Sequence, residues 1–171
     1  MENIRCPSII DLEASGFGTE SYPIEVGVAH TSGERYCALI KPATSWRHWS
    51  HHAETVHGIS RSLLIDKGLS PGLICDELNR FIGGGSVFSD AFTHDQHWLS
   101  KLYAIAKKRP TFQLRAIEHI MHETQVLIWD ATKLRLQKSL KLERHRASSD
   151  AFLVQQTYLQ SKLQMNVGLE I

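Results

Sequence analysis

Two acidic residues stand two positions apart at the end of a short apolar run, in "CPSIIDLEA" (6–14). Side chains at positions i and i+2 of a strand point to the same face, so Asp11 and Glu13 project together if this run is a strand. Two carboxylates held side by side repel each other unless a cation neutralises them. The pattern predicts a buried strand that carries a paired acidic site, and an exposed strand end is the simpler alternative.

Further apolar runs and turn signals predict an α/β chain. Runs 23–31 and 35–41 read as strands, and the Ser-Gly-Glu turn between them predicts an antiparallel hairpin. Ser70 as the N-cap, Pro71 at the first helical position and Gly83 past the end mark a helix over 70–84. The remaining expected elements are helices near 51–58 and over 95–109, 130–140 and 149–163, and strands over 86–91 and 112–117. Strands that come first and then alternate with helices predict a mixed central sheet flanked by helices.

Length and charge limit the classes of function. The 171 residues suit one domain spanning 1–171, and a net charge of +1 argues against a strongly basic nucleic-acid coat. Residues 1–100 carry 7 Lys/Arg against 12 Asp/Glu, whereas residues 101–146 carry 11 against 4. This asymmetry fits a metal site beside a phosphate-contacting surface, although solvated helix faces are the commoner cause of such patterns.

Three cysteines lie far apart and form no CxxC pair, which is typical of reduced thiols in a cytoplasmic protein. The N-terminal apolar run is too short for a signal peptide, and no stretch approaches the roughly 20 apolar residues of a membrane span. We therefore expect a soluble, cytoplasmic protein with no membrane partner.

Three more residues can join the acidic pair. Asp95 and Asp150 each begin a predicted helix, where an acidic residue often serves only as a partner of the helix dipole. His145 lies five residues before Asp150, close enough in sequence to reach a water molecule that this carboxylate helps to hold. Four carboxylates could hold two divalent cations on a phosphodiester, while a neutral histidine removes a proton from the attacking water. Hard oxygen ligands favour Mg²⁺ or Mn²⁺ over zinc.

Three segments resemble the motifs of the DEDDh exonuclease superfamily, in the expected order. They are "IIDLEASGFG" (9–18), "SDAFTHDQHWL" (89–99) and "HRASSDA" (145–151), and the HxxxxD spacing of the last is typical of the His subtype. "IEVG" (24–27) and "ETVHGIS" (54–60) resemble the second strand and the "HGI" loop of that family. Matching features run from about residue 8 to 152, nearly the whole chain.

The resemblance implies a ribonuclease H-like fold and 3′→5′ exonuclease activity on single-stranded DNA or RNA, releasing nucleoside 5′-monophosphates. It implies that Asp11 bridges two ions, Mg²⁺ or Mn²⁺. Glu13 and Asp150 would help hold one ion and Asp95 the other. His145 would be the general base.

The resemblance also implies residues that contact the substrate. Leu12, Ala14 and Ser15 would line the pocket of the 3′ nucleotide, and His57 would lie near that nucleotide. The family usually has Thr-Thr-Gly after the glutamate, whereas this chain has Ala14, Ser15 and Gly16, which puts a hydroxyl contact at position 14 in doubt.

The residues themselves suggest two more contacts. Phe17, directly after the first motif, could stack on an unpaired base, and Arg146 beside His145 could contact a phosphate. Packing is the alternative role for an aromatic residue. Asp90 could add a charge near the site or face solvent, and we favour solvent.

Two other functions remain open. The chain could be a catalytically silent nucleic-acid-binding or partner domain with the same fold, or a subunit that acts only inside a polymerase or RNA-processing complex. No motif separates DNA from RNA substrates, because that choice depends on contacts to the 2′ position. A homodimer is possible, but the sequence has no interface signature.

Overall fold

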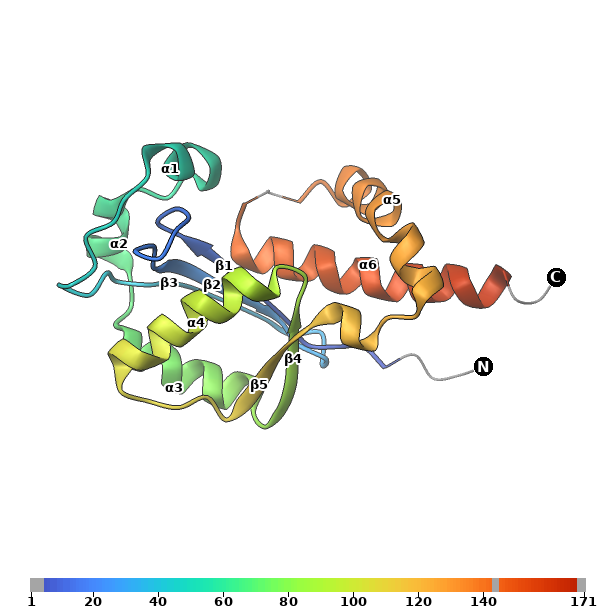
Figure 1. Ribbon diagram of the computed structural model, residues 1–171, viewed down its shortest axis with the longest axis horizontal. Coiled ribbons are helices and arrows are strands. Elements are labelled where there is room, and N and C mark those ends of the chain that lie inside the picture. Colours follow the sequence, from blue (N-terminus) through green and yellow to red (C-terminus); the bar gives the residue numbers. More distant parts are fainter. Residues whose placement is uncertain (1–4, 143–144, 169–171) are drawn as a thin grey trace.

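A five-stranded mixed sheet is the centre of the fold (Figure 1). The computed structural model describes residues 5–142 and 145–168. Within these residues the strands are β1 (Ile9–Ala14), β2 (Pro23–Ala29), β3 (Arg35–Leu39), β4 (Gly85–Ser89) and β5 (Phe112–Ala116). Their order is β3-β2-β1-β4-β5; β2 runs antiparallel to its neighbours β1 and β3, and β4 and β5 run parallel to β1. The predicted hairpin and mixed sheet are confirmed.

Alternation along β1 assigns its two faces to different layers. Ile10, Leu12 and Ala14 are buried in one apolar cluster with residues of α3 (Pro71–Ile82) and α4 (Phe92–Ala106). Ile9 belongs to a second cluster with residues of α6 (Ala147–Gly168). Because side chains alternate in a strand, Asp11 and Glu13 share the α6 face with Ile9. Figure 1 shows α6 and the α3–α4 pair on opposite sides of the sheet.

Capping residues define the short helices as predicted. The Ser50 side chain accepts a hydrogen bond from the Ala53 amide at the start of α1 (His51–His57), which ends at Gly58 with φ of 69°. Ser70 caps α3 in the same way. Sequence analysis missed α2 (Arg61–Lys67), although Ser60 and Gly68 flank it in the same positions as Ser50 and Gly58 flank α1.

Two helices begin earlier than predicted. Helix α4 starts at Phe92, so Asp95 lies inside its first turn and not at its start. Helix α5 (Glu123–Leu140) follows a short 3₁₀ helix, η1 (Ile117–Ile120), and packs mainly along α6. Its buried residue Gln125 donates from Nε2 to the Tyr158 carbonyl and to Ser161 Oγ. None of the helices that the structure describes has the length and apolar character needed to cross a membrane.

The start of α6 lies directly against β2 at Gly27. A Cβ atom at this position would lie 2.1 Å from the Ser148 backbone nitrogen and 2.2 Å from the Ala147 carbonyl carbon. Glycine is therefore required for this close approach of a helix to a strand. The contact fixes the start of α6, and with it Asp150, relative to the sheet.

Gly27→Ala should push α6 away from the sheet. We expect a loss of about 1–3 kcal/mol in the free energy of unfolding, the usual cost of overpacking, measured by urea denaturation. Gly72→Ala is the matched control, because a Cβ there would meet only Lys108 Cε at 3.9 Å. Alanine in that helix should raise stability by up to about 1 kcal/mol. Equal stability of the two variants would contradict the tight contact at Gly27.

Candidate active site at the carboxyl ends of the central strands

The five residues expected to be catalytic converge on one edge of the sheet. One possible ligand atom from each of Glu13, His145 and Asp150 lies within 4.8 Å of the others. Burial, followed by the charges of Asp95 and Asp150, raises the pKa of Asp11 well above its ordinary value. Asp11 is thus within electrostatic reach of the other three carboxylates.

Topology explains this convergence. Asp11 and Glu13 lie on the α6 face of β1, and Asp150 lies in the first turn of α6. Asp95 lies in the first turn of α4, just after β4. Because β1 and β4 run parallel, their carboxyl ends meet at the same edge, where α/β sheets usually bind ligands.

Asp95 is a buried carboxylate with a hydrogen-bond partner on only one of its two oxygens, among the residues described. Only 1% of the residue is exposed, and its Oδ2 accepts a hydrogen bond from the Ser89 hydroxyl. Its Oδ1 is also buried, and it has no hydrogen-bond partner among the residues described. Burial is the main cause that raises the pKa of Asp95 to about 7, against the lowering effect of Ser89. A buried oxygen in this condition is suited to a cation, because buried polar atoms otherwise find partners.

Glu13 has a raised pKa as well, although the charge of Arg146 opposes the shift. Burial first, and then the charges of Asp150 and Glu25, raise the pKa of Glu13 to about 8. The donor set is mainly carboxylate oxygen, which fits the hard cations Mg²⁺ and Mn²⁺. The residues present therefore fit the expected divalent cations.

Asp90 contradicts its sequence-based assignment. Its side chain is only 18% exposed and forms an ion pair with Lys133 of α5, so the expectation that it faces solvent is wrong. The charge of Asp90 also contributes to the raised pKa values of Asp11 and Asp95. Asp90 adds negative charge near the site, and Lys133 partly offsets that charge.

The three residues expected to line the nucleotide pocket are all buried and do not form an open binding surface. Leu12 and Ala14 are buried in the core. Ser15 is 1% exposed; its hydroxyl bonds with His48 Nδ1 at 2.9 Å and accepts from the Tyr22 amide at 3.1 Å. Its backbone groups also have partners within the chain. Direct nucleotide contacts by these three residues stay predictions.

His57 ends α1 with one ring nitrogen unused. Its Nδ1 accepts a hydrogen bond from the Ile59 amide at 3.0 Å, whereas its Nε2 is buried without a partner in the described part of the chain. Burial lowers the pKa of His57, and the charge of His145 acts in the same direction. His57 therefore lies within electrostatic reach of the candidate general base.

Phe17 forms an exposed aromatic surface, as its expected stacking role requires. The residue is 74% exposed, and its ring centroid lies 5.3 Å from that of His94 and 6.3 Å from that of Trp98. A hollow of about 300 Å³ adjoins these rings and is lined by Gly18, Thr19, Ser21, Thr93, His94, His97 and Trp98. Sequence analysis missed His94 and Trp98, although their places beside Asp95 in the second motif were a usable signal.

Arg146 has a partner inside the protein. Its guanidinium donates to both carboxylate oxygens of Glu25, with its shortest contact, from Nη2 to Oε1, at 2.7 Å. The expected phosphate contact of Arg146 stays a prediction. Sequence analysis did not assign a role to Glu25, although "IEVG" was noted as a family-like segment.

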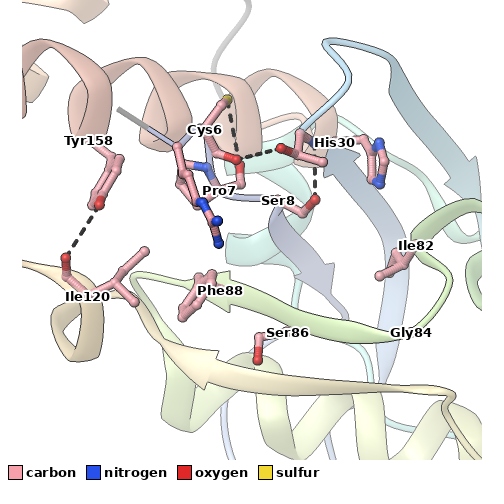
Figure 2. Close-up of a pocket in the computed structure, with 12 residues that line it drawn as sticks. Cys6, Pro7, Ser8, His30, Ile82, Gly84, Ser86, Phe88, Ile120 and Tyr158 are labelled. Carbon is pink, nitrogen blue, oxygen red and sulfur yellow. Dashed lines mark hydrogen bonds between the residues drawn. The ribbon is translucent and has the colours of Figure 1, made fainter. Parts of the chain in front are cut away.

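A second hollow lies at the other end of the sheet (Figure 2). It has a volume of about 500 Å³, and Cys6, Pro7 and Ser8, which lead into β1, form part of its wall. Gly84 and Ser86, at the start of β4, form another part. Because these are the amino ends of the two strands, the hollow is separate from the acidic edge.

Solved structures of known proteins resemble this chain in fold, whereas the comparisons of sequence found no match. No protein-family model matches the chain, and no curated protein matches it in sequence. Escherichia coli exonuclease I with a dA16 oligonucleotide superposes with a TM-score of 0.65 at 13% identity, covering 86% of this chain and 38% of that one. The chain is similar in fold to the matched part of exonuclease I.

Further solved structures with this fold agree. The zinc-bound complex of E. coli exonuclease I with single-stranded DNA has a TM-score of 0.67 at 12% identity, covering 91% of this chain and 40% of its own. Exonuclease I from Methylocaldum szegediense superposes with a TM-score of 0.53 at 17% identity, covering 81% of this chain and 31% of that one. This chain spans about two fifths or less of the length of these proteins. The predicted ribonuclease H-like architecture is confirmed, and the resemblance of the sequence motifs to DEDDh exonucleases is matched by a likeness in fold to exonuclease I.

Replacing Glu13 should remove a pH-dependent loss of stability in the metal-free protein. Its folded-state pKa of about 8 exceeds the ordinary 4.5, so its favourable contribution is complete at low pH and is lost as pH rises through 8. Glu13→Gln should therefore melt a few degrees above wild type at pH 8.5, with a smaller gain at pH 6, by calorimetry without divalent cations. The exposed Glu20→Gln variant is the control. A gain from Glu13→Gln that does not change with pH would contradict the raised pKa.

Proposed function

We propose that the chain is a metal-dependent 3′→5′ exonuclease that removes nucleoside 5′-monophosphates from single-stranded nucleic acid. The observation that carries this proposal is the convergence of Glu13, His145 and Asp150, with Asp11 and Asp95 in electrostatic contact. The fold supports it, because exonuclease I has been solved with single-stranded oligonucleotides. The 3′ polarity rests on the resemblance of the three motifs.

Four carboxylates would hold the cations. Asp11, Glu13 and Asp150 are the ligands proposed for one, and Asp11 with the unpartnered Oδ1 of Asp95 for the other. When bound, two Mg²⁺ or Mn²⁺ ions supply charge neutralisation for the phosphodiester and lower the pKa of water. The protein contributes a fixed arrangement of carboxylates whose ionised forms are disfavoured until positive charge is bound.

His145 is the proposed general base. It occupies a left-handed backbone conformation, with φ of 55°, immediately before α6. This places its imidazole beside Glu13 and Asp150, where a ring nitrogen in the neutral form accepts the proton of the attacking water. The same proton can then pass to solvent, because His145 is only half-buried.

Aromatic groups beside the site favour an unpaired substrate. Phe17 is exposed and contacts the rings of His94 and Trp98, which lie on α4, the helix that also carries Asp95. Stacking on aromatic rings binds every base through its π face and requires that the base be unpaired. Single-stranded ends are therefore the proposed substrate class.

The direct test is digestion of matched single-stranded DNA and RNA oligomers that carry a 5′ label. With Mn²⁺ or Mg²⁺, wild-type protein should produce a ladder that shortens from the 3′ end, and mass spectrometry should detect nucleoside 5′-monophosphates. Asp11→Ala and Asp150→Ala should abolish the ladder, because each removes a proposed ligand. The DNA and RNA arms identify the preferred sugar. Intact oligomers in both arms, with tight binding retained, would instead favour the silent binding domain.

His145→Ala should leave a folded enzyme with a slow chemical step. Loss of a general base usually costs about 10²–10⁴ in rate, so kcat should fall by that factor. Exposed His119→Ala is the control and should behave as wild type. An unchanged kcat in His145→Ala, with the melting temperature preserved, would remove His145 from the mechanism.

A further inference from the structure

Glu25, in β2, accepts hydrogen bonds from the two residues that follow His145. The residue is completely buried, and its carboxylate accepts from Arg146 Nη2 at 2.7 Å and from Arg146 Nε at 3.1 Å. It also accepts from the backbone amide of Ala147 at 2.8 Å. One buried carboxylate thus fixes both a side chain and the main chain at the entry to α6.

The place of Glu25 in the sheet brings this contact next to the acidic edge. Glu25 is the register partner of Glu13 across the β1–β2 pair, so the two side chains lie on the same face. The loop that Glu25 holds is therefore held at a defined distance from Glu13. Sheet register thus helps to set the positions of Arg146 and Ala147, the two residues that follow His145.

His145 needs such support from its surroundings. A residue other than glycine at φ of 55° costs about 1–2 kcal/mol relative to ordinary helical geometry, and it persists only where neighbours hold it. Two further contacts hold the chain just after Ala147. Gly27 admits the backbone of Ala147 and Ser148, and Arg35 Nη2 donates to the Ser148 carbonyl at 2.6 Å.

We propose that Glu25 is a positioning residue that, through Arg146 and Ala147, sets the orientation of the His145 imidazole for the nuclease reaction. The inference rests on the proposed function. A buried ion pair could alternatively serve only to attach α6 to the sheet. The two roles differ in one respect: positioning acts through His145, whereas attachment does not.

A double-mutant cycle separates these roles. We compare wild type, Glu25→Gln, His145→Ala and the double variant, measuring kcat and KM on one labelled oligomer. Glu25→Gln keeps the size of the side chain but removes the charge that two donors of Arg146 share. Loss of a supporting contact of this kind typically costs about 10–100-fold, so kcat should fall by that factor while KM changes less than about twofold.

The two roles predict different effects of Glu25→Gln on kcat in a protein that already lacks the His145 side chain. If Glu25 acts through His145, the second change should lower kcat by less than about twofold, because non-additivity reports a shared pathway. An equal fold-loss in both backgrounds would overturn the proposal. The charge of Glu25 also acts on Glu13, so Glu25→Gln can change the affinity for Mn²⁺. A calorimetric titration with Mn²⁺ gives the Kd of each variant, and kcat is compared with all four proteins saturated with the metal. A loss of kcat that disappears at saturating Mn²⁺ would show that Glu25 acts on the carboxylates and not on His145.

Two further variants complete the test, one as a substitute for Glu25→Gln and one as a control. Arg146→Gln removes the other half of the pair and should show the same non-additivity with His145→Ala if Glu25→Gln does not fold. A phosphate-binding role for Arg146 would instead raise KM in both backgrounds. Glu77→Gln is the matched control, since Glu77 accepts from the Tyr36 hydroxyl at 2.7 Å on the opposite face, and its kcat should equal wild type.

The cycle also distinguishes the two levels of proposal. Absence of activity in both wild type and Glu77→Gln would overturn the nuclease function and the positioning role together. An active wild type, an impaired His145→Ala and an unimpaired Glu25→Gln would overturn the positioning role alone.

Discussion

Carboxylates held together in a partly buried site are the constraint on which the rest of the structure depends. Asp11, Glu13, Asp95 and Asp150 lie at one edge of the sheet. Burial is the largest cause of the raised pKa values of Asp11, Glu13 and Asp95, and neighbouring carboxylates add to it. The apolar layers on both faces of the sheet supply, through burial of their side chains, the free energy that offsets this cost. Ser89 and Lys133 contribute locally, through a hydrogen bond to Asp95 and an ion pair with Asp90. The protein is thereby organised around an arrangement that a divalent cation would relieve.

Because side chains alternate along a strand, the two faces of β1 and β2 carry different kinds of residue. On one face, β1 and β2 contribute aliphatic side chains to the core with α3 and α4. On the other, the same strands present Glu13 and Glu25 toward the start of α6. Glu25 is neutralised by Arg146, and the charge of Arg146 also acts on Glu13, whose pKa it lowers in part. The two adjacent carboxylates differ because Glu25 forms the ion pair directly.

Local signals in the sequence predicted the elements, and contacts distant in sequence explain what was missed. Spacing of i and i+2 placed Asp11 and Glu13 on one face, and cap residues such as Ser50 and Ser70 located helix starts. Asp90 was misassigned because its partner Lys133 lies on a helix 43 positions later. Glu25 was not recognised because its contacts with Arg146 and Ala147 depend on how α6 docks on the hairpin. The grouping of the five candidate residues agrees with the motifs, while their roles stay predictions.

The attachment of α5 links a peripheral motion to the ionic state of the acidic edge. This helix packs mainly along α6, so it can detach at a lower free energy than the central strands. Lys133 leaves with it, and Asp90 then loses its counter-charge. Transient detachment of α5 would thus leave more uncompensated negative charge at the acidic edge. Exchange of the α5 amides with solvent is therefore linked to the electrostatics of that edge.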